Sequence, residues 1–163
     1  MPTQIDYLST YLQDHRAGAA MGVNLAQRLR DENEGTPHED FLTLLARQIE
    51  EDVATLESIM ERFDIDRSTM KEAGAKIGEK LGRLKPNEHL TSYSPLSRVQ
   101  ELEMMRSGVQ GKLALWDTLF EIADLHDRLD ALELRSLIER AETQLSGLRE
   151  HHRMAAHEAF GDY

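Results

Sequence analysis

The sequence contains no cysteine, four prolines and few aromatic residues. Without cysteine there is no disulfide framework, no thiolate metal site and no cysteine nucleophile. The scarcity of proline and of β-branched residues, beside abundant Leu, Ala, Glu and Arg, favours helix along the whole chain. No apolar run approaches the roughly 20 residues that cross a bilayer, and the N-terminus has no basic region followed by an apolar one. We therefore expect an all-α protein of the cytoplasm.

Positive charge is also scarce. The 163 residues carry 19 Lys and Arg against 30 Asp and Glu, which gives a net charge of -11. A general nucleic-acid binder needs Lys and Arg to displace phosphate counterions, and an anionic membrane repels an acidic surface. We therefore expect neither nucleic acid nor membrane as a partner, which leaves a second copy of the chain or another protein. The length suits a single domain, residues 1–163.

Capping signals divide the chain into four long helices. Thr36 and Glu39 have the spacing of a capping box, with a proline between them at the first helical position. Ser94, followed by proline, and Asp130 are the expected N-caps of the last two helices. The expected helices span residues 3–30, 36–63, 95–126 and 130–159.

Within each helix, apolar residues recur at alternating steps of three and four, which is typical of an amphipathic helix packed on other helices. The stripes of the first two helices are Ile5, Leu8, Leu12, His15, Ala19, Gly22, Ala26 and Leu29, and then Leu42, Leu45, Ile49, Asp52, Leu56, Ile59 and Phe63. Those of the last two are Val99, Leu102, Arg106, Val109, Leu113, Trp116, Phe120 and Ala123, and then Leu134, Ile138, Ala141, Leu145, Leu148, His152, Ala155 and Ala159.

The connection between the second and third helices is long and contains a shorter amphipathic stretch over residues 68–84. A helix of that length spans about 25 Å at 1.5 Å per residue, so the connection can run the length of the bundle. The other two connections are short, which makes their helices antiparallel neighbours. The sequence therefore predicts an up-down-down-up four-helix bundle whose long crossover carries a short fifth helix.

This arrangement resembles the ferritin-like superfamily over nearly the whole chain. Residues 11–15 (YLQDH), 48–52 (QIEED) and 95–98 (PLSR) are similar to a bacterial branch of it that lacks the Glu-x-x-His motifs and has no established activity. Active ferritin-like di-iron proteins hold their metals with inward-facing carboxylates and two Glu-x-x-His motifs. This chain contains no Glu-x-x-His at any position. The resemblance therefore implies the fold and not a standard di-iron site.

Polar residues interrupt each of the four stripes: His15, Asp52, Arg106 and His152, with Glu103 one step from the third. One interpretation is a structural polar cluster in which Asp52 pairs with Arg106 or His15, since such buried clusters can fix helix register. The alternative is a divalent-metal site made by His15, Asp52, Glu103 and His152, because imidazole and carboxylate suit Fe, Mn or Zn. Arg106 favours the structural cluster, since a permanent cation repels a metal ion.

Three classes of function remain open. The first is a non-catalytic structural or interaction module, with no catalytic residue and no cofactor. The second is a divalent-metal-binding protein or oxidase with the non-standard site just described. The third is a small-ligand binder, because Ala19, Gly22 and Ala26 are small enough to leave space in the bundle interior.

Overall fold

The computed structural model describes residues 1, 3–65 and 92–161. It contains α1 (Gln4–Glu32), α2 (Glu39–Arg62), α4 (Pro95–Glu121), the short 3₁₀ helix η3 (Ala123–Leu125) and α5 (Ala131–Phe160). In these described ranges there is no strand, so the all-α class is confirmed. The fifth helix expected over residues 68–84 lies outside the described residues. None of the described helices is long and apolar enough to cross a membrane.

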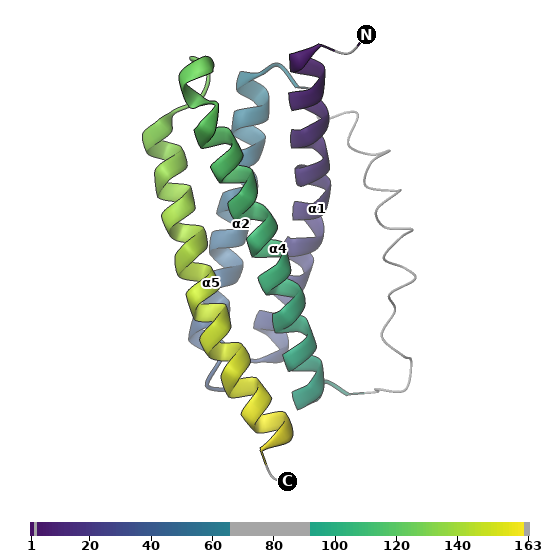
Figure 1. Ribbon diagram of the computed structural model, residues 1–163. Helices are drawn as coiled ribbons and strands as arrows, with labels where there is room; N and C mark the ends of the chain where they lie inside the picture. The colour runs from purple at the N-terminus through teal and green to yellow at the C-terminus, as the bar shows by residue number, and fades with distance from the viewer. Residues whose placement is uncertain (2, 66–91, 162–163) are drawn as a thin grey trace.

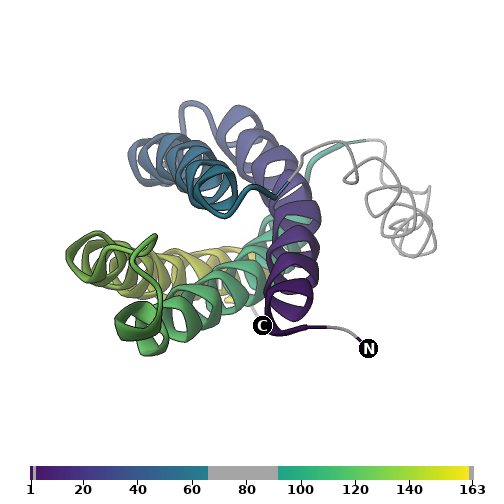
Figure 2. The same cartoon turned by 90° about the horizontal axis from the view of Figure 1, so that it is seen from above.

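The helices form two antiparallel hairpins, α1 with α2 and α4 with α5 (Figure 1). In the same view α2 and α4 run in the same direction, and α1 and α5 run opposite to them. Seen from above, the two hairpins lie against each other with α1 beside α4 (Figure 2). The boundary between α1 and α4 is therefore the principal junction between the hairpins.

Three of the four long helices begin at a side-chain N-cap, and two of these caps are where the sequence predicts them. Ser94 forms a capping box with Ser97 at the start of α4, and the Asp130 carboxylate accepts hydrogen bonds from the backbone N–H groups of Leu132 and Glu133. Thr3 forms the corresponding box at the start of α1. These bonds satisfy backbone donors that have no partner inside the helix.

The start of α2 differs from the prediction of a capping box between Thr36 and Glu39. The helix begins at Glu39, and His38 occupies the N-cap position without a side-chain capping bond. Gly35 has a φ of 74°, which turns the chain so that its own N–H donates to the Glu39 carboxylate at 2.7 Å. The Thr36 hydroxyl accepts instead from the His38 N–H at 3.2 Å. The box does not form because the Glu39 carboxylate and the Thr36 hydroxyl are bonded to these other backbone donors.

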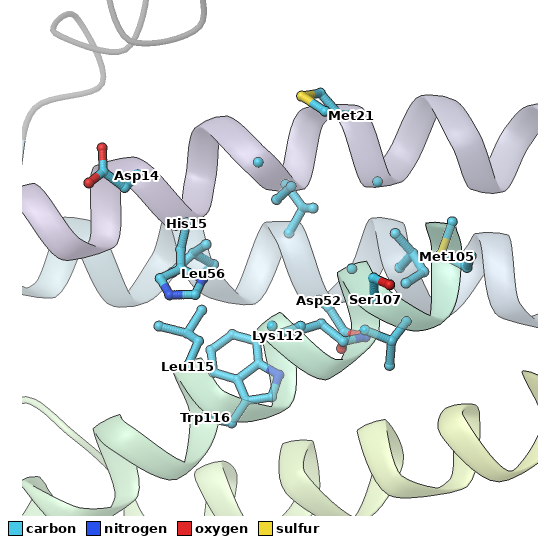
Figure 3. Close-up of a pocket in the computed structure, with 18 residues that line it drawn as sticks. Asp14, His15, Met21, Asp52, Leu56, Met105, Ser107, Lys112, Leu115 and Trp116 are labelled. Atoms are coloured by element: carbon cyan, nitrogen blue, oxygen red, sulfur yellow. The ribbon is translucent and has the colours of Figure 1, made fainter. Parts of the chain in front are cut away.

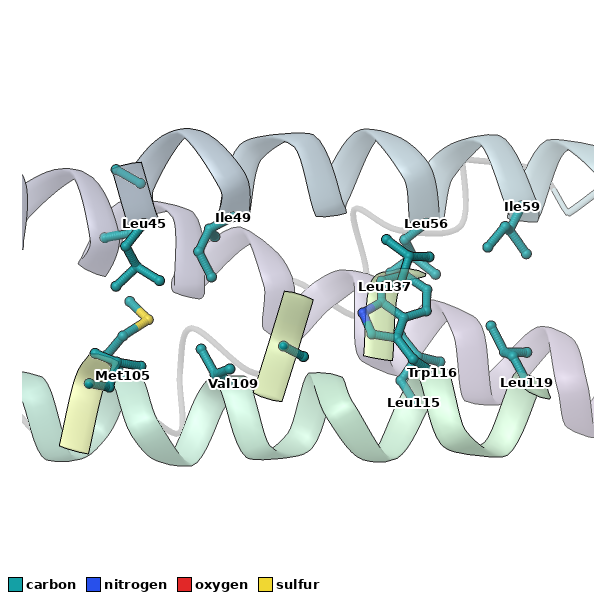
Figure 4. Packing of buried hydrophobic residues seen from close by; sticks show 14 of the residues in the cluster. Leu45, Ile49, Leu56, Ile59, Met105, Val109, Leu115, Trp116, Leu119 and Leu137 are labelled. Atoms are coloured by element: carbon teal, nitrogen blue, oxygen red, sulfur yellow. The ribbon is translucent and has the colours of Figure 1, made fainter. Parts of the chain in front are cut away.

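The core lies between the hairpins and is dense along α2 (Figure 4). Every member of the stripe predicted for this helix is buried. On α4 half of the predicted stripe is buried, namely Val99, Leu102, Val109 and Trp116. Met105, Leu115 and Leu119 are also buried, where the prediction chose Arg106, Leu113 and Phe120. The reason is that α4 packs against both α1 and α5, so its buried face is wider than a single stripe. An α-helix also drifts by about 20° per heptad against a strict seven-residue repeat.

One close contact lies between α5 and α2, where Gly147 meets the ring of Phe41. A Cβ at Gly147 would lie 2.3 Å from Cε2 of that ring. The ring is also stacked on His151 with centroids 4.3 Å apart. The absence of a side chain at Gly147 therefore allows the Phe41 ring to stand between the two helices.

Candidate functional site

Asp52 occupies the middle of the α2 stripe and is only 3% exposed. Its carboxylate accepts one hydrogen bond from the ammonium of Lys112 on α4 and another from the guanidinium of Arg140 on α5. A carboxylate removed from water needs such charged donors, because an isolated buried charge is costly. Asp52 therefore links the first hairpin to both helices of the second.

The network extends beyond this ionic centre. The Lys112 ammonium also donates to the Gln144 amide oxygen, and the Gln144 amide nitrogen donates to Oε1 of Gln48 at 3.0 Å. Nη1 of Arg140 lies 3.0 Å from Oε2 of Glu51. Burial lowers the pKa of Lys112 below its usual value, and the adjacent Asp52 carboxylate opposes that change. The charged groups of this network are thus paired with one another.

A groove of about 470 Å³ lies beside this network, between α1, α2 and α4 (Figure 3). Both Asp52 and Lys112 reach it, so its polar part is the edge of the ionic centre. Its volume is within the range of small-molecule sites, about 300–1,000 Å³. The rest of the wall is mostly apolar and includes Ile49, Leu56, Met105, Val109, Leu115 and Trp116.

Glycines on two helices border the groove: Gly18 and Gly22 on α1, and Gly108 and Gly111 on α4. A Cβ built on any of the four would meet no heavy atom within 4 Å. A glycine in a helix can allow the close approach of a neighbouring group, as Gly147 does for the Phe41 ring. Here they leave open space, although each lowers helix stability by about 1 kcal/mol relative to alanine.

Two further residues of the wall, His15 and Trp116, carry polar atoms. His15 is half-buried in the wall of the groove, and burial lowers its pKa. The centroid of its ring lies 4.6 Å from that of the Tyr11 ring, which it meets edge-on. The Trp116 side chain is 1% exposed, and its indole N–H has no acceptor among the described residues. A buried donor without a partner costs about 1–3 kcal/mol.

The metal hypothesis named four residues, which the structure divides into two groups. His15 and Asp52 line the groove, whereas Oε1 of Glu103 and Nε2 of His152 lie 3.0 Å apart between α4 and α5 and do not line it. Within residues 1, 3–65 and 92–161, no three His, Asp or Glu side chains are grouped so that they could hold a metal ion.

The structural cluster forms around Asp52, but the predicted partners are wrong. Lys112 and Arg140 bind Asp52, while Arg106 lines a separate polar depression between α4 and α5. The sequence does contain a signal for Lys112, which lies three residues after Val109 and four before Trp116. An alternating stripe passes equally through position 112 or 113, and the prediction took the apolar Leu113.

A comparison of the chain with protein-family models, with curated proteins and with solved structures finds no match.

Proposed function

We propose that this chain is a non-catalytic binding module of the four-helix class, and that the groove between α1, α2 and α4 accepts a small apolar ligand. The observation that carries this proposal is the set of four glycines whose Cβ positions face open space. They keep an apolar wall accessible at a cost in helix stability. Ala19 and Gly22, two of the residues expected to leave space, both line the groove.

The chemistry beside the groove supports binding rather than catalysis. Asp52, Lys112 and Arg140 are held in mutual ion pairs, and buried pairs of this kind can fix the register of packed helices. The order of helix directions supports a relation with ferritin-like bundles, and a second copy of the chain remains a candidate partner. The metal-binding alternative has less support, because its four residues do not come together.

The single tryptophan makes the proposal testable in the full-length chain, since Trp116 lines the groove and no other indole contributes to the emission. We expect the neutral fluorophore 1-aminoanthracene to bind and to receive energy from Trp116. We also expect it to raise the melting temperature in a concentration-dependent manner, as a ligand specific for the folded state must. The absence of both effects would overturn the proposal.

A pair of leucine substitutions on α1 tests whether the fluorophore binds in the groove. Gly22→Leu places a side chain in the open space, and we expect it to weaken binding of the fluorophore by at least about tenfold, or 1.4 kcal/mol. Ala20→Leu adds a similar side chain to an exposed position of the same helix that does not line the groove, and should leave binding unchanged. Equal effects of the two variants would show that the fluorophore binds elsewhere.

Metal analysis of the purified protein tests the alternative that the chain binds a divalent metal. Protein incubated with Fe(II), Mn(II) or Zn(II) and then desalted is analysed for metal beside a His15→Ala variant. We expect no near-stoichiometric metal in either sample. Retention by the natural chain and loss in the variant would favour the metalloprotein and count against a purely apolar ligand.

A further inference from the structure

A second buried polar cluster lies where the loop between α1 and α2 meets the C-terminal half of α5. His38 precedes α2 and its side chain is fully buried. Its Nδ1 lies 2.9 Å from Nδ1 of His151, and its Nε2 lies 3.3 Å from Oε1 of Glu158. Both partners are on α5. The two histidines therefore join the start of α2 to the last turns of α5.

The position of the protons follows from these distances. A carboxylate only accepts, so the Glu158 contact requires a proton on Nε2 of His38. A neutral His38 then has a bare Nδ1, which accepts the hydrogen bond from the Nδ1–H of His151. A first extra proton can enter at Nε2 of His151 without disturbing that bond. A second, on Nδ1 of His38, would direct two N–H groups at each other across 2.9 Å.

Charged groups from two helices face the pair. Arg98 on α4 binds the second oxygen of Glu158 at 2.6 Å, so Glu158 is shared between Arg98 and His38. Burial is the main cause that lowers the pKa of both histidines below the ordinary value of 6.5. The charge of Arg98 lowers the pKa of His38 further, that of His38 lowers the pKa of His151, and Glu158 and Glu150 oppose these changes.

We propose that His38 and His151 form a proton-operated junction, which holds the end of α5 on the start of α2 and opens when both rings are protonated. The sign follows from burial. Because the folded chain binds these protons less readily than the unfolded chain, the neutral pair stabilises the junction above the ordinary histidine pKa. That stabilisation is lost progressively as the pH falls below it.

Hydrogen–deuterium exchange of the full-length chain tests the junction locally. Between about pH 7.5 and about pH 5, with rates corrected for intrinsic exchange, we expect the protection of residues 148–160 to fall by about tenfold or more, because opening of the junction exposes these amides. The middle of α4 should keep its protection. Unchanged protection of residues 148–160 at the lower pH would overturn the proposal.

His151→Gln separates this junction from general acid sensitivity. An amide can either donate to or accept from Nδ1 of His38 and takes up no proton itself, so we expect the variant to show a smaller loss of protection in acid than the natural chain. His157→Gln, at an exposed position of the same helix, should show the same loss as the natural chain. An equal loss of protection by His151→Gln in acid would overturn the proposal.

Should His151→Gln fail to fold, imidazole ¹⁵N resonances of the natural chain decide the question. We expect a bare Nδ1 on His38 and a protonated Nδ1 on His151 at neutral pH. We also expect both rings to be protonated before the exchange protection is lost. The reverse tautomers, or loss of protection with only one ring protonated, would contradict the junction.

Discussion

Replacing Asp52 with alanine is expected to lower the free energy of unfolding by about 3–5 kcal/mol, the range found when one partner of a buried ion pair is removed. The cause is the pair of cations left behind. Arg140 is 26% exposed and can turn its guanidinium toward water, whereas Lys112 is 15% exposed and remains largely buried. Urea unfolding followed by Trp116 emission and by circular dichroism measures the loss.

Two further variants test whether the loss of stability comes from the buried cation left without its partner. Asp117→Ala removes an exposed carboxylate from α4 and should change stability by no more than about 0.5 kcal/mol. Asp52→Ala combined with Lys112→Met removes both charges of one pair, and we expect it to recover a large part of the stability, because no ammonium is then left buried without its partner. A loss below about 1 kcal/mol for Asp52→Ala alone would contradict the buried ionic centre.

Replacing the four groove glycines with alanine is expected to raise the free energy of unfolding by about 2–4 kcal/mol in total. Each position is inside a helix, where alanine is more favourable than glycine by about 0.5–1 kcal/mol. No heavy atom lies within 4 Å of the four new Cβ atoms, so no steric cost opposes the gain. Urea unfolding of the fourfold variant, and of each single variant, measures it.

Gly147→Ala is the matched control and should have the opposite sign. Its Cβ would enter the Phe41 ring, which must shift and lose its stacking on His151. Overpacking of this kind costs about 1–3 kcal/mol, which outweighs the gain in helix propensity. A stabilising Gly147→Ala, or a destabilised fourfold variant, would contradict these distances between the helices.

If the groove binds a ligand, the fourfold alanine variant should also bind 1-aminoanthracene more weakly. Such a loss of function often accompanies added stability.

The sequence was most informative for the buried face of α2 and for the starts of the last two helices. On α2 the charged residues leave one consistent stripe, and its members from Leu42 to Phe63 are all buried. The N-caps at Ser94 and Asp130 were also predicted correctly, because a cap depends on a few neighbouring residues. Both the buried face of a helix and an N-cap are determined by residues close together in the chain, so the sequence alone can predict them.

The stripes of α4 and α5 were less accurate, because each of these helices offers adjacent positions that could equally face the core. On α5 the prediction took Leu145 as the stripe position, whereas the adjacent Gln144 is 2% exposed and bonds Lys112. Hydrophobicity alone favours leucine over glutamine at a buried position. Which of two adjacent positions faces the core depends on the rotation of the helix, and that rotation is set by the partners and not by the stripe itself.

The candidate site could be predicted only in part. Asp52 was identified as a buried charge, since it interrupts an otherwise apolar stripe. Its partners were missed because Arg140 reaches Asp52 from a flank of α5, a contact that depends on the length of the side chain rather than on spacing. The groove was indicated by Ala19 and Gly22. Its other glycines, Gly18, Gly108 and Gly111, were given no role, because only the arrangement of α1 and α4 in space brings them to one groove.

The division of the bundle into two hairpins has a consequence for the order of folding. The contacts within each hairpin join residues close in the chain, whereas the contacts between α1 and α4 join residues far apart. Local contacts form first, because less chain entropy is lost in closing them. The boundary between α1 and α4 should therefore be completed late and be among the first regions to separate on unfolding. A ligand bound in the groove at that boundary would act mainly by slowing the opening of the bundle.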